Sequence, residues 1–94
     1  MNHKKYFHIG FYFSDHPLGK ELEPTFTRCS DDWIRYCENC WVIYTKYTPE
    51  ELLRELKQYL GEKDQLLILE IKNDQQISGW LPQWIWNWLY KTRH

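Results

Sequence analysis

The sequence predicts a single α+β domain over residues 1–94, with the element order βαββαβ, an antiparallel sheet and a Trp-rich C-terminal helix. The clearest signal lies at residues 40–71, where a β-branched and aromatic run, a capped helix and a second apolar run follow one another with little sequence between them. A chain of 94 residues also has the length of one domain with a modest core. These observations indicate an architecture but do not indicate a chemistry.

The first predicted strand covers residues 6–13, which are apolar or aromatic at nearly every position, as in a central strand. Gly10 in its middle indicates a bulge or the close approach of another backbone. A helix is predicted within residues 21–31. Its start is expected near Leu22 or Glu23, because Pro24 is tolerated only in the first turn of a helix.

Residues 33–44 are predicted to form a β-hairpin. Two runs of apolar and aromatic residues, 33–37 and 40–44, flank a two-residue turn at Glu38–Asn39. Asn tolerates the positive φ that the commonest hairpin turns require, so the turn is predicted at this position.

A second helix is predicted over residues 49–60 by three start signals. Thr48 can cap the first free N–H groups, Pro49 occupies the first helical position, and Glu51 can close a capping box. The leucines that form its apolar stripe are Leu52, Leu53, Leu56 and Leu60. The run at 64–71 is predicted to be the last strand of the sheet, and to be buried.

The C-terminal segment 80–91 is predicted to be an aromatic helix that begins at Pro82. A helix that is apolar around most of its circumference is seldom exposed to solvent. We therefore expect it to pack on the sheet, to be buried in a dimer interface or to bind a partner. The residues that we expect to bind a partner protein are Trp84, Trp86, Trp88, Tyr90, Lys91 and Arg93.

Composition narrows the class of protein. The chain has six Trp, seven Tyr and four Phe, more large rings than a small core can bury. This predicts that several rings lie at an interface or a binding face. The alternative is that large rings compensate for the small number of side chains in the core. The net charge of −1 argues against a general nucleic-acid binder. Three Cys cannot complete a disulfide framework, and neither a signal peptide nor a membrane span is evident. We expect a soluble, cytoplasmic protein that does not bind membranes.

Two groups of residues could carry chemistry. Cys37 and Cys40 have the spacing of a zinc knuckle, with Cys29 and His16 as further ligands, but a structural zinc site needs four ligands and no second paired motif is present. A strand hairpin explains the two cysteines without a metal, so no metal site is predicted. Asp15 beside His16 could hold a divalent cation or move a proton, although this is also ordinary loop composition.

Several stretches resemble the SinR-like small proteins, relatives of the CRISPR-associated adaptation endoribonucleases. They are IGFYF, Trp33, CWVIYT, TPEELLRELKQYL and DQLLILEI, and they span residues 6–71. The resemblance implies a ferredoxin-like subunit that pairs into a homodimer through sheet edges. It also implies, for the nuclease branch, a metal-binding Asp at the end of the first strand. That position is Tyr12 here, which argues against nuclease activity.

Two functions remain as hypotheses. The first is a non-catalytic, dimeric protein-interaction module of a bacterial or phage conflict or defence-related system, which binds or inhibits a partner protein and needs no cofactor. The alternative is a metal-dependent endoribonuclease or nucleic-acid-binding protein of the CRISPR-adaptation type, with Asp15 and His16 at an Mg or Mn site.

Overall fold

A computed structural model describes residues 3–15, 18–72 and 76–93. Its elements are β1 (Lys5–Tyr12), α1 (Gly19–Cys29), β2 (Asp32–Cys37), β3 (Cys40–Thr45), α2 (Pro49–Lys57), β4 (Gln65–Ile71) and α3 (Gln83–Leu89). The strands form one antiparallel sheet in the order β2-β3-β1-β4. The protein is therefore an α+β fold with an antiparallel sheet, as the sequence predicts.

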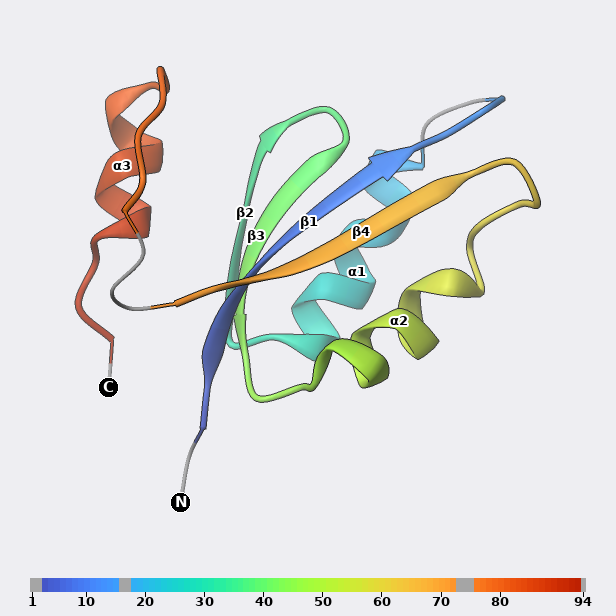
Figure 1. Cartoon of the computed structure of the whole chain (residues 1–94), viewed down its shortest axis with the longest axis horizontal. Helices are drawn as coiled ribbons and strands as arrows, with labels where there is room; N and C mark the ends of the chain where they lie inside the picture. Colours follow the sequence, from blue (N-terminus) through green and yellow to red (C-terminus); the bar gives the residue numbers. More distant parts are fainter. Residues whose placement is uncertain (1–2, 16–17, 73–75, 94) are drawn as a thin grey trace.

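The main core lies between the sheet and the helices α1 and α2, which cover the same face (Figure 1). Side chains alternate between the two faces of a strand, so every second residue of β1 and β3 points to this side. The largest buried side chains of this core are Phe7 and Ile9 of β1, Trp41 and Ile43 of β3, Leu22 and Phe26 of α1, and Leu52 and Leu56 of α2. Trp41 is completely buried and packs against the ring of Phe26 at 5.0 Å.

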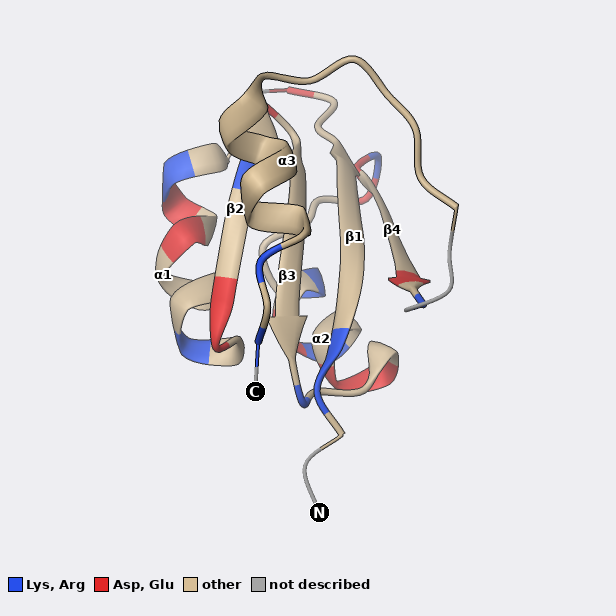
Figure 2. Cartoon of the chain, turned by 90° about the vertical axis from the view of Figure 1, so that its left-hand side faces the viewer, with Lys and Arg blue, Asp and Glu red and all other residues tan. Residues whose placement is uncertain are grey.

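Helix α3 covers the opposite face of the sheet, over β2 and β3 (Figure 2). Ile85 of α3 is buried there against Ile34 of β2 and Val42 of β3, and these three residues centre a second, smaller core. The β1–β4 half of the same face has no helix over it (Figure 2). As a result Leu67 and Leu69 of β4, which pair with Gly10 and His8 in the register of the sheet, are 58% and 51% exposed.

Local signals predicted α2 and α3 well. Thr48 and Glu51 form the predicted capping box, with Pro49 at the first helical position, although α2 ends at Lys57 rather than at residue 60. Helix α3 begins at Gln83, one residue after the predicted start at Pro82, which is its N-cap residue, and it ends at Leu89, within the predicted segment 80–91. Within the described ranges, no helix has the length and apolar character that a membrane crossing requires.

The predicted start of the first helix was wrong. Helix α1 begins at Gly19, so Pro24 lies inside it rather than in its first turn. Pro24 removes one backbone hydrogen bond. The buried stripe of Gly19, Leu22, Thr25, Phe26 and Cys29 outweighs that loss, because most helix stability in proteins comes from packing of one face.

Two predictions about the strands also need correction. The pairing of β1 runs without a shift through Gly10, so there is no bulge at this residue. The hairpin turn does lie at Glu38–Asn39, but Asn39 does not adopt a positive φ. Instead the hairpin accommodates its twist with a register shift between Arg35 and Cys37.

Candidate functional site

A groove of about 740 Å³ lies on the α3 side of the sheet, between β4, α3 and the segment that precedes α3. Its walls are mainly apolar, formed by Val42, Leu69, Ile71, Leu81, Ile85 and Leu89. Polar side chains also line it, namely His8 and Tyr36 on the sheet floor and Glu70, Gln76 and Ser78 toward the segment before α3. We call this feature the sheet groove. A mainly apolar cavity with a few convergent polar groups is the usual form of a binding site.

Two strands on either side of β3 supply the polar side chains at the sheet floor of the groove. His8 of β1 and Tyr36 of β2 reach across β3, and Nε2 of His8 lies 2.5 Å from the hydroxyl of Tyr36. Tyr36 stands at the register shift of the hairpin, between Arg35 and Cys37. The groove therefore contains a hydrogen-bonded His–Tyr pair among apolar neighbours.

Two thiols continue this line of polar groups. Cys40 interacts with the Tyr36 hydroxyl and with the thiol of Cys37, its register partner in the hairpin. A Cβ placed on Gly10 would lie 3.5 Å from the His8 ring and 3.9 Å from the Cys40 sulfur, so both side chains lie over this glycine. We call His8, Tyr36, Cys40 and Cys37 the polar row.

The electrostatics of His8, Tyr36 and Cys40 favour their neutral forms. Burial lowers the pKa of His8. Burial, and then the neighbouring Cys40 thiol, raise the pKa of Tyr36 well above its usual value. Burial, and then the Cys37 thiol, raise the pKa of Cys40. A catalytic thiol needs a lowered pKa, so Cys40 is not activated as a nucleophile.

The structure separates the cysteines that the zinc-knuckle spacing suggested. Cys29 is the last residue of α1 and points into the main core, whereas Cys37 and Cys40 belong to the polar row on the other face of the sheet. His16 lies outside the described residues. In the part of the chain that the structure describes, no three His, Cys, Asp or Glu side chains are placed to hold a metal ion.

Asp15 lies beyond the end of β1 and is exposed. It lines a separate pocket of about 600 Å³ with Ser14, Glu62 and Asp64, apart from the sheet groove. Ser14 donates through its backbone N–H and its hydroxyl to Oδ1 of Asp64, at 2.8 and 3.1 Å. These contacts join the loop after β1 to the loop before β4, and they do not bring Asp15 to the polar row.

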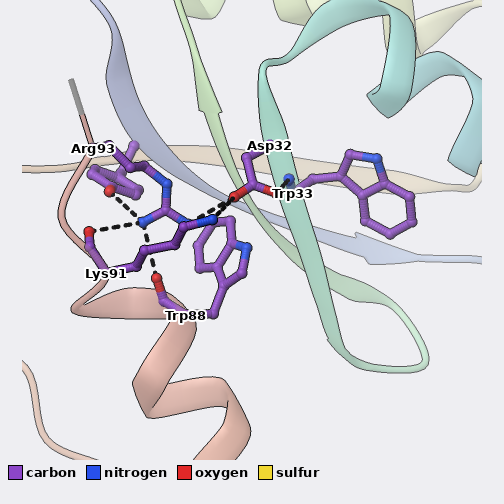
Figure 3. A network of polar contacts seen from close by, with 6 residues as sticks. Asp32, Trp33, Trp88, Lys91 and Arg93 are labelled. Atoms are coloured by element: carbon purple, nitrogen blue, oxygen red, sulfur yellow. Dashed lines mark hydrogen bonds and ion pairs between the residues drawn. The ribbon is translucent and has the colours of Figure 1, made fainter.

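Arg93 is bound within the chain (Figure 3). Its Nη1 donates to the hydroxyl of Tyr6 at 2.7 Å and to the carbonyl of Trp88 at 2.9 Å, and its Nη2 donates to Oδ2 of Asp32 at 2.9 Å. The guanidinium also lies over the rings of Trp88 and Tyr6, at 4.2 and 5.3 Å. Its side chain is 7% exposed. We call this cluster the C-terminal anchor.

The other predicted partner-binding residues differ in accessibility. Trp84 and Tyr90 are 57% and 67% exposed. Trp86 is half-buried and stacks on Tyr90, with ring centroids 6.0 Å apart. Trp88 packs against the second core beside Ile85, and Lys91 is exposed, with its ammonium 4.0 Å from Asp32. Trp84 and Tyr90 are thus the members of this set most available to a partner.

Sequence reasoning missed the sheet groove. The one available signal was the two-residue spacing of Leu67 and Leu69 with His8 and Gly10 on the neighbouring strand, because residues two apart share a face. The pairing of His8 with Tyr36 has no sequence signal, because it depends on the strand order and on the register shift.

No protein-family model, curated protein or solved structure matches this chain. A proposal for its function therefore depends on the sheet groove, the polar row and the exposed side chains described above.

Proposed function

We propose that the protein is a non-catalytic interaction module that binds an apolar segment of a partner protein in the sheet groove. The observation that carries this proposal is the uncovered β1–β4 half of the sheet, where Leu67 and Leu69 are more than half exposed beside the groove. Covering these two leucines would contribute about 1 kcal/mol each to binding. Exposed apolar surface of this kind marks interaction sites.

The distribution of exposed apolar side chains supports the same face. Among the described residues, the large apolar side chains that are exposed are Tyr12, Leu53, Leu67, Leu69, Ile77, Trp80, Trp84 and Tyr90. Leu53 lies on α2, on the far side of the sheet, and the others belong to the open sheet half or to the C-terminal segment. Trp and Tyr are the residues most enriched at binding hot spots.

The polar row supports binding rather than catalysis. Burial favours the neutral forms of His8, Tyr36 and Cys40, and neutral groups can be covered by a partner at a smaller desolvation cost than charged ones. The His8–Tyr36 pair would then offer a hydrogen bond to a polar group of the bound segment.

We further propose a ferredoxin-like assignment and a homodimer. The βαββαβ order and the sheet order β2-β3-β1-β4 support the first. For the second, β4 is an edge strand with exposed leucines, and such strands pair readily with a second chain. The resemblance to SinR-like small proteins favours a role in a bacterial or phage conflict system, in which the module binds or inhibits its partner.

Capture of a partner from host lysate tests the proposal with matched variants. Leu69→Asp places a charge in the groove wall, and Leu53→Asp places the same charge on α2 at a similarly exposed leucine. We expect a partner that survives nuclease treatment to be lost with Leu69→Asp and kept with Leu53→Asp, both variants being folded by circular dichroism. Equal capture by the two variants would contradict the groove as the binding site.

The same eluates address the alternative function. Nucleic acid that co-elutes without a protein partner, together with Mg- or Mn-dependent cleavage that is lost in Asp15→Ala, would favour the endoribonuclease hypothesis. The proposed dimer is checked by light scattering during size-exclusion chromatography. We expect twice the chain mass for the native protein and a monomer for Leu67→Lys, and a native monomer would exclude the dimer.

A further inference from the structure

The β2–β3 hairpin holds two thiols opposite each other. Cys37 and Cys40 are register partners on either side of the turn Glu38–Asn39, so their side chains point to the same face of the sheet. Direct partners in an antiparallel pair have Cα atoms about 4.5–5.5 Å apart, and a disulfide spans Cα separations of about 4.4–6.8 Å. The backbone therefore already has the separation that a disulfide needs.

A contact from β1 and a contact within the hairpin fix the turn between the two thiols. The backbone N–H of Phe11 donates to the carbonyl of Asn39 at 2.9 Å. Arg35 donates to the carbonyl of Glu38 through Nε at 3.0 Å and Nη2 at 2.5 Å. Because both turn carbonyls are held, the two sulfur atoms are kept near each other, which favours a reaction within the chain over one between chains.

We propose that Cys37 and Cys40 form a reversible modification site, at which exchange with a low-molecular-weight disulfide such as glutathione disulfide closes a disulfide across the turn. The proposal depends on the hairpin geometry and does not require the proposed binding function. It distinguishes this pair from Cys29, which is buried in the main core with no cysteine partner in the structure described.

The two thiols have different roles in the exchange. Cys37 is exposed, so its thiolate attacks one sulfur of glutathione disulfide, whose S–S bond breaks and releases one glutathione thiolate. The raised pKa of Cys40 keeps most of its thiol protonated, but its place opposite Cys37 compensates for this. Once Cys40 loses its proton to solvent, its sulfur attacks the Cys37 sulfur of the mixed disulfide and releases the second glutathione. The two protein thiols lose two electrons in total, and one glutathione disulfide is reduced to two thiols.

Oxidation would alter the polar row as well as the turn. The Cys40 thiol that interacts with the Tyr36 hydroxyl is consumed in the bond to Cys37. Since Tyr36 is bound to His8 in the wall of the groove, the disulfide would change the hydrogen-bonding groups at that wall. The hairpin thus connects the redox state of the thiols to the groove surface.

The test equilibrates the native protein with glutathione buffers of increasing oxidised fraction, quenches with acid, alkylates in denaturant and digests with trypsin. Cleavage after Arg35 and Lys46 gives one peptide that contains both Cys37 and Cys40, and Cys29 falls in another. We expect the first peptide to lose both labels and two hydrogen atoms in mass, while the Cys29 peptide stays labelled. Two labels, or glutathione adducts only, at every buffer ratio would overturn the proposal.

Single variants test the order of the steps. Cys40→Ser keeps the exposed thiol and is expected to stop at a mixed disulfide with one glutathione on Cys37. Cys37→Ser keeps the half-buried thiol and is expected to react more slowly. If the native protein also stops at the mixed disulfide under conditions where Cys40→Ser does, the intramolecular bond does not form and the proposal fails.

Discussion

Arg93 donates to Asp32 over 2.9 Å, and this contact joins the end of the C-terminal segment to the first residue of β2, 61 positions earlier (Figure 3). Partial burial by itself would raise the pKa of Asp32, but hydrogen bonds from Arg93 and Trp88, with the nearby positive charges, outweigh it and lower that pKa. The pair therefore stabilises the docked position of α3, whose packing forms one wall of the sheet groove.

Replacement of Arg93 by Met tests the C-terminal anchor. Arg93→Met keeps the apolar stem of the side chain but removes the hydrogen bonds to Asp32 and Tyr6. We expect a loss of about 1–3 kcal/mol in the free energy of unfolding, measured with urea, because hydrogen bonds to charged groups have this value. Lys91→Met is the control, and its exposed, longer ion pair should contribute under about 1 kcal/mol. Equal losses in the two variants would contradict an anchor centred on Arg93.

The same pair predicts a pH dependence. The pKa of Asp32 is lower in the folded chain than its ordinary value of 3.8, so the unfolded chain binds more protons in the interval between the two values. The stability that the pair contributes is then complete above the ordinary pKa and is lost as the pH falls through the folded one. We expect the difference between the native protein and Arg93→Met to shrink in urea titrations between neutral pH and pH ~2. A difference that grew on acidification would exclude Asp32 as the titrating group.

Helix starts that depend on neighbouring residues could be predicted from the sequence, whereas those that depend on packing against distant elements could not. The α2 start was predictable because Thr48, Pro49 and Glu51 act on one another within a single turn. The start of α1 was not, because the stripe led by Gly19 and Leu22 gains its energy from packing against the sheet rather than from neighbours in sequence.

The site shows the same division. The leucine run in β4 predicts a buried strand, yet Leu67 and Leu69 are exposed. The sequence of β4 contains no information on how much of the sheet α3 covers, so this exposure could not be predicted from it. From the sequence, Arg93 is predicted to be a solvated charge near the C-terminus. Its contacts with Tyr6 and Asp32 join residues far apart in the sequence, so no local pattern indicates them.

The His8–Tyr36 pair predicts a titration that can be observed directly. Burial lowers the pKa of His8 below its ordinary value of 6.5, and we expect NMR of the imidazole protons to show this shift in the folded protein. Tyr36→Phe should leave the pKa of His8 low, because burial rather than the hydrogen bond is its cause. A pKa at or above 6.5 in the native protein would contradict a neutral polar row.

This shift also has a consequence for stability. Since the folded chain binds fewer protons at His8 than the unfolded chain, the stabilising contribution is complete above pH 6.5 and is lost as the pH falls through the folded pKa. His8→Gln, which cannot titrate, should show a flatter dependence of unfolding free energy on pH in that window. An unchanged slope would assign the effect to another group.

Gly19 predicts a coupling between α1 and the hairpin. A Cβ at this position would overlap the guanidinium of Arg35, which lies 5.0 Å from the centre of the Trp41 ring and is hydrogen-bonded to the carbonyl of Glu38. Gly19 does not have a positive φ, so its backbone accepts alanine and the cost comes from displacing Arg35. We expect Gly19→Ala to lose about 0.5–1.5 kcal/mol of unfolding free energy, the value of the hydrogen bonds that Arg35 gives up.

A double-mutant cycle isolates this coupling. In an Arg35→Met background the guanidinium is absent, so Gly19→Ala should cost little, and it could gain from the better helix propensity of alanine. Urea unfolding of the four proteins should therefore give losses that do not add, as expected for residues in contact. Additive losses would show that alanine at position 19 acts through some contact other than the Arg35 guanidinium.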